Sequence, residues 1–236
     1  MAVKVEQFKV RGARSFPSGI SIVVPYHGVY DRVTRLLESI FRLTHGIAYE
    51  ICLVDDNSPN ADYLLELEGV HPIRCHRNPT QLGFGGALKV GCGMAAYPYA
   101  VCLHSDCVVE DVNWLNAMAE ALMRLRGQKV RMVSPRTNNP LNGHAAQAGV
   151  KGRDDGDYVL KDGENLSLYC FMCHLDLFKQ IGGFIKDYPY GWYEDVELAY
   201  RMQHHGYRQA VAAGAWVRHE GEVTVRNVRR KHQGAR

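Results

Sequence analysis

Residues 20–25 read ISIVVP and residues 49–59 read YEICLVDDNSP, and these two stretches decide the fold. Each contains a short apolar run without polar alternation, which is typical of a strand covered on both faces in a parallel sheet. Between them, apolar residues recur along one stripe, which predicts a helix capped by Asp31 and ended by Gly46. The order is therefore strand, helix, strand.

The same alternation continues along the chain, because short buried runs alternate with segments of helical spacing. Repeated crossovers of this kind are right-handed and produce a parallel sheet. We therefore predict an α/β fold: one Rossmann-like domain with a mainly parallel central sheet flanked by helices. Further strands are expected at residues 73–76, 100–103, 130–135 and 166–173, and helices at residues 83–96, 111–126, 176–181 and 194–205.

Length and composition fit a single folded domain. A chain of 236 residues, 46% of them hydrophobic, can bury one sizeable core. We expect an N-terminal extension at residues 1–18, the folded domain at residues 19–221 and a basic tail at residues 222–236. The irregular stretch 137–163 is longer than an ordinary connection, which is typical of a functional loop.

Charge, hydropathy and cysteine content narrow the class of protein. A net charge of +3 is too small to require a nucleic-acid partner. The odd number of cysteines, seven, indicates a reducing compartment, and no stretch reaches the length of a signal peptide or a membrane span. We therefore expect a cytoplasmic protein without an integral membrane segment. Cys170 and Cys173 have zinc-site spacing but no second pair, so we expect core residues.

Acidic residues follow predicted strands or begin a predicted helix at three places. They are Asp55 with Asp56, Asp106, and Glu194 with Asp195. Each place alone has a structural explanation, either turn formation or a favourable charge at a helix N-terminus. Polar groups that follow parallel strands share one edge of the sheet, so together these places are expected to ring one cleft.

Several short motifs occur in a fixed order along the chain. They are VPY at residues 24–26, VDDNS at 54–58, Asn78 with GFGGA at 83–87, SD at 105–106, GF at 183–184, EDVEL at 194–198 with Arg201, and His219 with Gly221. Their collinear order resembles that of family-2 glycosyltransferases, which are inverting enzymes with the GT-A fold. The resemblance implies transfer of a sugar from a nucleotide-sugar donor to a hydroxyl acceptor.

By that resemblance, the donor nucleotide would lie against the ends of the first two strands and the glycine-rich loop. Carboxylates there would accept hydrogen bonds from the base or ribose, and glycines would let the backbone approach the diphosphate. We expect a UDP-sugar or a dTDP-sugar. The residues implied are Pro25, Tyr26, Asp55, Asp56, Asn78, Gly85, Gly86, His104 and Ser105.

The resemblance also implies a divalent cation. Asp106 matches the final acid of the family's DxD motif, which holds the ion against the donor diphosphate, and His219 matches a histidine that completes this site in some relatives. The first acid of the motif is replaced here by His104. Because imidazole suits Mn²⁺ better than Mg²⁺, we expect Mn²⁺, with Mg²⁺ as the alternative.

By the same resemblance, the catalytic residues are the acidic pair that begins the helix at residues 194–205. Inverting transfer needs a carboxylate that takes the proton of the acceptor hydroxyl. Asp195 is the expected general base, and Glu194 is expected to contact the acceptor. Trp192 is a candidate platform for the acceptor, and the tail at residues 222–236 is a candidate lid over the diphosphate.

Two other interpretations remain open, and a third lacks a motif that it needs. The basic tail permits an anionic acceptor, including modified DNA, and His104 motivates a nonenzymatic nucleotide-sugar-binding protein. A sugar nucleotidyltransferase would need a basic glycine-rich loop after the first strand, and residues 25–28 (PYHG) supply none. The sequence identifies neither the acceptor nor the oligomeric state.

Overall fold

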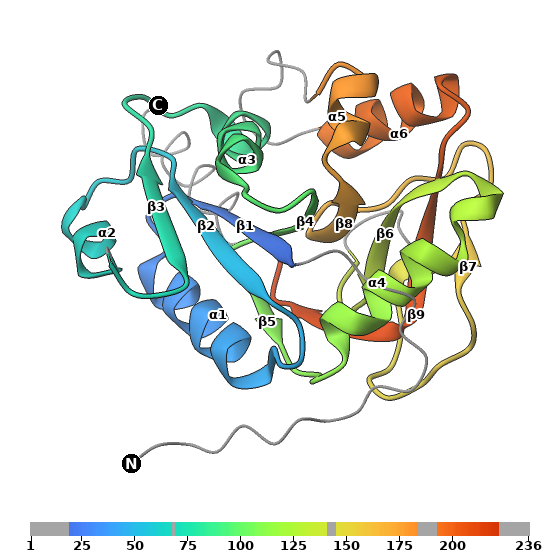
Figure 1. The fold of residues 1–236 in the computed structure, drawn as a ribbon, viewed down its shortest axis with the longest axis horizontal. Helices are drawn as coiled ribbons and strands as arrows, with labels where there is room; N and C mark the ends of the chain where they lie inside the picture. Colours follow the sequence, from blue (N-terminus) through green and yellow to red (C-terminus); the bar gives the residue numbers. More distant parts are fainter. Residues whose placement is uncertain (1–18, 68, 141–144, 184–192, 222–236) are drawn as a thin grey trace, which may run out of the picture.

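A mixed sheet of nine strands lies between layers of helices in the computed structural model, which describes residues 19–67, 69–140, 145–183 and 193–221 (Figure 1). Its strands are β1 (Ile20–Tyr26), β2 (Tyr49–Asp55), β3 (Ile73–Arg77), β4 (Tyr99–Leu103), β5 (Cys107–Val109), β6 (Val130–Arg136), β7 (Tyr158–Val159), β8 (Cys170–His174) and β9 (Arg208–His219). The order across the sheet is β3-β2-β1-β4-β8-β6-β9-β5, with β7 paired to β9.

The first half of the sheet is parallel. Strand β1 pairs with β2 and β4, and β2 pairs with β3, all in the same direction. The crossovers run through α1 (Tyr30–Leu43), α2 (Asp62–Leu67) and α3 (Gly83–Met94). Residues of β1 are buried throughout, as expected for a strand covered on both faces. The strands predicted at residues 20–25, 49–54, 73–76 and 100–103 are confirmed.

The second half of the sheet is mixed. Strand β8 runs antiparallel to both β4 and β6, whereas β9 runs parallel to β6 and antiparallel to β5. The strand predicted at residues 166–173 is shorter than expected, because β8 begins only at Cys170. The long strand β9 was not predicted, since its sequence RQAVAAGAWVRH is rich in alanine and contains a glycine, both weak strand formers.

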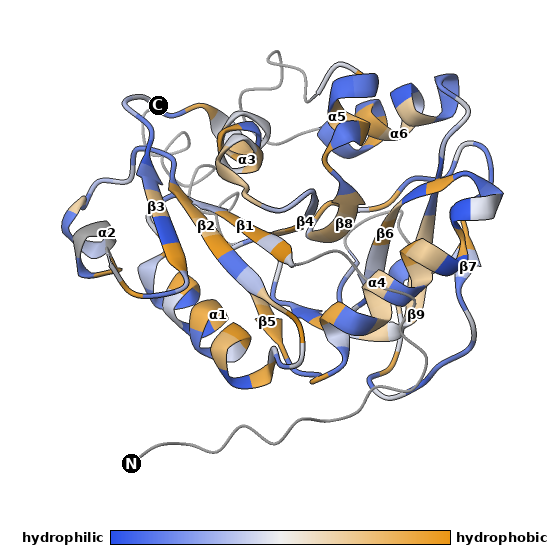
Figure 2. Ribbon diagram, in the orientation of Figure 1, coloured by the Kyte–Doolittle hydropathy of each residue, from blue (hydrophilic) through white to orange (hydrophobic). Residues whose placement is uncertain are grey.

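Helices cover both faces of the sheet, and each face has its own hydrophobic core. Helices α1 and α4 (Trp114–Arg124) pack on one face, with Leu36, Ile40 and Trp114 buried there. Helices α3, α5 (Asp176–Gln180) and α6 (Glu194–His204) pack on the other, with Leu88 and Leu198 buried. Figure 2 shows apolar residues along β1, β2 and α1, whereas the edge strand β3 is largely hydrophilic.

The ends of α1 differ from those predicted. Asp31 lies inside the first helical turn, and Val29 is the residue that precedes the helix. A carboxylate in the first turn still interacts favourably with the helix dipole, so Asp31 stabilises the N-terminal end of α1 without capping it. The helix ends at Leu43 and is followed by Thr44, and Gly46 takes a positive φ of 75° two residues later in the loop.

All seven cysteines are free. Cys170 and Cys173 are both buried, but Cys170 belongs to the core under α1 and α4 and Cys173 to the core under α3 and α6. Side chains on opposite faces of a sheet cannot share one ion. The interpretation of this pair as core residues is confirmed.

The topology directs several predicted site residues to one edge of the sheet. The carboxyl ends of β1, β2 and β4 lie side by side there, and β5 pairs with β9 so that Cys107 is opposite His219. In the part of the chain that the structure describes, every helix falls short of the length and apolarity that a bilayer crossing needs. Trp192 and the segments at residues 1–18 and 222–236 lie outside the described residues, so their predicted roles stay predictions.

Candidate metal and nucleotide site

Asp56 connects the end of β2 to the start of α3. Its carboxylate accepts hydrogen bonds from the Asn78 side-chain amide at 2.8 Å and from the backbone N–H groups of Leu82 and Gly83 at 2.8 and 2.9 Å. Asp56 and Asn78 are both buried, and a negative charge at a helix N-terminus is favourable. The carboxylate therefore fixes the glycine-rich loop in place.

Close packing explains a glycine in this loop. A Cβ added at Gly86 would lie 2.6 Å from the Cβ of Leu82, closer than two carbon atoms can approach. The buried Gly85 precedes it in the first turn of α3. The absence of side chains at these positions leaves the backbone of the loop approachable, as the binding of a diphosphate would require.

Asp55 has a different role from Asp56. It is fully buried, accepts a hydrogen bond from the backbone N–H of Ser58 at 2.8 Å and forms an ion pair with Arg77. Burial, and then the nearby charge of Asp55, raise the pKa of the Tyr26 phenol well above its usual value. The buried Tyr26 hydroxyl has no hydrogen-bond partner among the described residues, so it remains a protonated donor for a ligand.

Three side chains form a cluster with the composition of a metal site. One nitrogen each of His104 and His219 and one oxygen of Asp106 lie within 4.8 Å of one another. Asp106 Oδ1 is 3.3 Å from His219 Nε2 and 3.8 Å from His104 Nδ1. Asp106 Oδ1 and His219 Nε2 are buried and make no hydrogen bond to any described residue. Two such atoms facing each other fit ligation of a shared cation.

The surroundings of His219 favour the form that binds metal. Its Nδ1 lies 2.9 Å from the backbone carbonyl of Asn139, so in the neutral ring Nδ1–H donates there and Nε2 carries the lone pair. The ring stacks on Tyr169 at 5.0 Å between centroids. The side chain of Asn138 pairs with both backbone groups of His219, accepting from its N–H and donating to its carbonyl. These contacts hold the ring with Nε2 directed at Asp106.

The electrostatics of the cluster also favour a cation. Burial lowers the pKa of His104 to about 4, although the neighbouring Asp106 and Asp195 charges act in the opposite direction. Burial alone would raise the pKa of Asp106, but the close approach of His219 and then the charges of His104 and His219 more than offset it and lower this pKa. Near neutral pH the cluster therefore presents neutral imidazole at His104 beside a carboxylate.

The acidic pair Glu194 and Asp195 begins α6, after Tyr193 in a left-handed conformation with a φ of 72°. Glu194 is buried, and its Oε1 has no hydrogen-bond partner among the described residues. Burial, together with the charge of Asp195, raises the pKa of Glu194 to about 6. Asp195 is only partly buried and accepts a hydrogen bond from the N–H of Val196 at 2.8 Å.

Contacts between these groups join them into one site. The ring of Phe84, from the glycine-rich loop, lies edge-on to that of His104 at 4.5 Å. The Asp195 charge raises the pKa of His104, so the two side chains are within electrostatic range. Pro25 lies near the end of β1, and Ser105 is buried in the turn between β4 and β5. The loop, the cluster of His104, Asp106 and His219, and the acidic pair therefore share the carboxyl edge of the sheet.

Sequence reasoning missed the residues that support this site. Arg77 forms an ion pair with Asp55 and offsets its charge. Arg77 stands directly before Asn78, a predicted site residue, and this position could have indicated its role. Two residues that orient His219 gave no usable signal: Asn139 lies in the irregular stretch 137–163, and Tyr169 lies in a predicted buried strand, where an aromatic side chain is expected in the core. Their roles depend on contacts between segments far apart in the sequence.

The family described as Glycosyl transferase family 2 matches residues 21–180. No curated protein sequence matches the chain.

Solved structures with a similar fold include several with bound nucleotides. GalNAc-T7 with UDP, GalNAc and Mn²⁺ is 16% identical with a TM-score of 0.66, covering 86% of this chain and 44% of that one. The mannosyltransferase PcManGT from Pyrobaculum calidifontis, in complex with GDP-Man and Mn²⁺, is 15% identical with a TM-score of 0.67, covering 89% and 59%. TarS 1-349 of S. aureus with UDP-GlcNAc is 17% identical with a TM-score of 0.60, covering 86% and 60%.

These similarities establish the fold. At identities of 15 to 17% they concern architecture alone, and the chain spans only 44 to 60% of the length of these structures. The expected α/β architecture of the GT-A type is confirmed.

Proposed function

The chain belongs to glycosyl transferase family 2, and on that premise we propose that it is an inverting glycosyltransferase. It would move a sugar from a nucleoside-diphosphate sugar to a hydroxyl acceptor. The observation that carries the proposal is the cluster of His104, Asp106 and His219 within 4.8 Å, in electrostatic range of the partly buried Asp195. A cation site beside a partly exposed carboxylate is the arrangement that this transfer needs.

The donor is proposed to be a UDP-sugar or a dTDP-sugar. Solved structures of this fold hold UDP-GlcNAc, UDP or GDP-Man, which supports a nucleotide sugar. In this chain the unpartnered hydroxyl of Tyr26 would donate to the nucleotide, and the loop at residues 83–86 would receive the diphosphate. Pro25, Asp55 and Asp56 would shape this pocket, since the carboxylates already fix the surrounding backbone.

A divalent cation, Mn²⁺ or Mg²⁺, is proposed to bind at His104, Asp106 and His219. When bound it would neutralise the negative charge that develops on the departing nucleoside diphosphate. The residues fit such an ion, because a buried carboxylate oxygen and a buried imidazole nitrogen face each other without another partner in the described structure. Two nitrogen ligands favour Mn²⁺ over Mg²⁺, which prefers oxygen.

Asp195 is proposed to act as the general base and Glu194 to bind the acceptor. Partial exposure lets Asp195 reach an acceptor hydroxyl that enters from solvent. Glu194 has a buried oxygen without a partner among the described residues, so an acceptor hydroxyl would satisfy it. A proton taken by Asp195 would leave the acceptor oxygen free to attack the anomeric carbon on the face opposite the diphosphate.

Replacement of the base tests this proposal. Asp195→Asn should lower the transfer rate by about 100-fold or more, because general base catalysis contributes roughly 10²–10⁴-fold, and should leave donor affinity within about twofold. Transfer and donor binding are measured separately, by product formation and by calorimetry with the nucleotide sugar and Mn²⁺. Asp162→Asn, at an exposed loop position, is the matched control. Turnover near that of the control would reject Asp195 as the base.

A nonenzymatic nucleotide-sugar-binding protein is the second candidate. The observation in its favour is His104, which stands where the family's motif has an acid. This candidate predicts that the chain binds a nucleotide sugar with metal yet neither transfers nor hydrolyses it. Donor turnover that depends on Asp195 would exclude it.

A further inference from the structure

A cavity lies at the opposite edge of the sheet from the proposed transfer site. It has a volume of about 210 Å³ and is bordered by Tyr99 at the start of β4, Val130 at the start of β6 and His174 at the end of β8. His104, at the other end of β4, is five residues from Tyr99, or about 16 Å along an extended strand. A ligand bound there would not overlap the donor.

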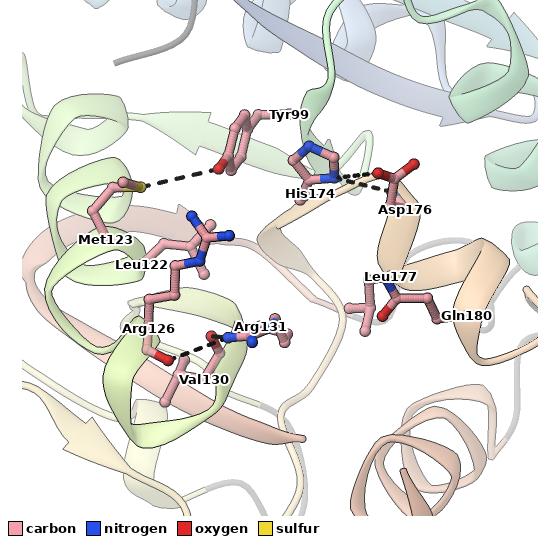
Figure 3. A pocket seen from close by; sticks show the side chains of 10 residues that line it. All are labelled: Tyr99, Leu122, Met123, Arg126, Val130, Arg131, His174, Asp176, Leu177 and Gln180. Atoms are coloured by element: carbon pink, nitrogen blue, oxygen red, sulfur yellow. Dashed lines mark hydrogen bonds and ion pairs between the residues drawn. The ribbon is translucent and has the colours of Figure 1, made fainter. Parts of the chain in front are cut away.

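The floor of this cavity is apolar and its rim is rich in hydrogen-bond donors. The buried side chains of Leu122, Val130 and Leu177 form the floor. In Figure 3 the guanidinium of Arg126 extends over Leu122 on one side of the hollow, and Leu177 and Gln180 lie on the other. Such a surface is complementary to a molecule with an apolar body and a polar head.

The two arginines of the rim carry charges that no acidic side chain of the described residues offsets. Within the described residues, neither Arg126 nor Arg131 has a carboxylate at ion-pair distance, although both line the cavity. The acid of the rim, Asp176, lies 3.5 Å from Lys179 and 3.6 Å from His174. The cavity therefore carries an excess of positive charge that a bound anion would neutralise.

Neighbouring groups hold two of these donors, Arg131 and Gln180, in place. The Arg131 guanidinium lies 5.3 Å from the centre of the Tyr207 ring and donates to the backbone carbonyls of Arg126 and Val130 at 3.3 and 3.1 Å. The Tyr207 hydroxyl donates to Gln180 Oε1 at 2.6 Å, which leaves the amide NH₂ of Gln180 as the free group. Donors that are ordered before a ligand arrives lose less entropy on binding.

We propose that this cavity binds a small organic anion, with a phosphate or carboxylate head held by Arg126 and Arg131 and an apolar body on Leu122, Val130 and Leu177. A phosphate monoester and a carboxylic acid share this chemistry. Two guanidiniums on one rim favour a head with several anionic oxygens, because each guanidinium can bind two of them. The site is independent of the nucleotide sugar and of the metal.

Calorimetry with phenyl phosphate, benzoate and inorganic phosphate tests the proposal on the full chain. The titrations are made in EDTA and at physiological salt, so that metal-dependent binding of a diphosphate is suppressed. We expect phenyl phosphate or benzoate to bind, and to bind about tenfold more tightly than inorganic phosphate, because about 50–60 Å² of apolar surface is removed from water. The tighter of the two aromatic anions identifies the head group.

Variants of the two rim arginines test whether the anion binds in this cavity. Arg126→Gln and Arg131→Gln should each weaken the aromatic anion by about tenfold or more, since each removes a charged hydrogen-bond donor. Arg42→Gln, which removes the same charge from an exposed position in the last turn of α1, should leave binding unchanged. Arg126 is exposed, so its variant should fold normally. Absence of binding to the wild-type chain, or equal affinity in all three variants, would overturn the proposal.

Discussion

Four buried polar atoms without a hydrogen-bond partner lie in the proposed transfer site. They are Tyr26 Oη, Asp106 Oδ1, Glu194 Oε1 and His219 Nε2, and Arg136 Nε is the fifth such atom in the part of the chain that the structure describes. Each unsatisfied buried group costs about 1–3 kcal/mol, so a fold that keeps four of them together is less stable than it could be. A bound donor, acceptor and cation would supply the missing partners.

Glu194→Gln should stabilise the fold and impair the reaction. Burial raises the pKa of Glu194 to about 6 from the ordinary 4.5, so the folded state binds this proton more tightly than the unfolded state does. The stabilisation that this proton gives is complete below pH 4.5 and is lost as the pH rises through 6. At pH 7.5 the buried carboxylate therefore costs about 1–2 kcal/mol, which an uncharged amide removes.

Urea unfolding in EDTA at pH 7.5 and pH 4 measures this effect. The variant should be more stable than the wild type by about 1–2 kcal/mol at the higher pH and nearly equal to it at the lower. Transfer should fall in the same variant, because the amide cannot accept as the carboxylate does. A stability difference that does not change with pH would show that the charge of Glu194 is not its source.

At the scale of a secondary-structure element, α3 shows how packing and function are coupled. A Cβ added at Gly91 would lie 2.3 Å from Val23 Cγ1 and 3.1 Å from Val54 Cγ2, so the helix lies directly on β1 and β2. Gly91→Ala should therefore destabilise the fold by about 1–3 kcal/mol through overpacking. Chemical denaturation of the purified variant measures the change.

Gly93 is the matched control two residues along the same helix. It is exposed, and an added Cβ would meet nothing within 4 Å. Gly93→Ala should stabilise the chain by about 0.5–1 kcal/mol, since alanine favours a helix and restricts the unfolded chain. Equal effects of the two substitutions would contradict the close contact between α3 and β1.

Asp56 provides a second test of the same helix. In Asp56→Asn one carboxylate oxygen becomes an NH₂ group, which cannot accept from a backbone N–H of Leu82 or Gly83. We expect a loss of about 1–3 kcal/mol in the free energy of unfolding and a parallel loss of donor affinity, because the loop at residues 83–86 is no longer fixed. Asp62→Asn, at the exposed start of α2, is the control. If Asp56→Asn binds the donor as tightly as the control does, the loop at residues 83–86 does not contribute to donor binding.

At the scale of the whole molecule, the sequence predicts the parallel half of the sheet better than the rest. Residues 20–25 and 49–54 are continuous apolar runs between turn formers, so local pattern and tertiary burial agree. Strand β9 has no such signal, because neighbours on both sides bury its alanines and make up for their weak strand preference. Strand β8 runs antiparallel to β4, and no local sequence pattern specifies the direction of a strand.

The cluster of His104, Asp106 and His219 illustrates the same limit. His219 was identified by its place in an ordered set of motifs, and nothing in the sequence shows how it reaches Asp106. The structure supplies the route: β5 pairs with β9 so that Cys107 is opposite His219, and the N–H of Glu220 donates to the Asp106 carbonyl at 3.0 Å. Pairing between distant strands depends on the whole fold, so residue type could be predicted while proximity could not.

A cation bound by this cluster would connect the turn after β4 with the end of β9, so Mn²⁺ should stabilise the whole domain. At a concentration of 100 times its Kd, a ligand that binds only the folded state adds about 2.7 kcal/mol, which for a chain of this length raises Tm by about 5–10 °C. Thermal unfolding with Mn²⁺, with Mg²⁺ and with EDTA measures the shift. Mg²⁺ should give a smaller shift in Tm, because two of the three ligands are nitrogens.

His219→Gln should lower Tm in EDTA, since the buried ring loses its contacts with Tyr169 and Asn139, and should also abolish the additional shift caused by Mn²⁺. The second effect is the decisive one: a variant that keeps the full Mn²⁺ shift would place the cation elsewhere, because a loss of packing alone lowers both curves and leaves their separation unchanged.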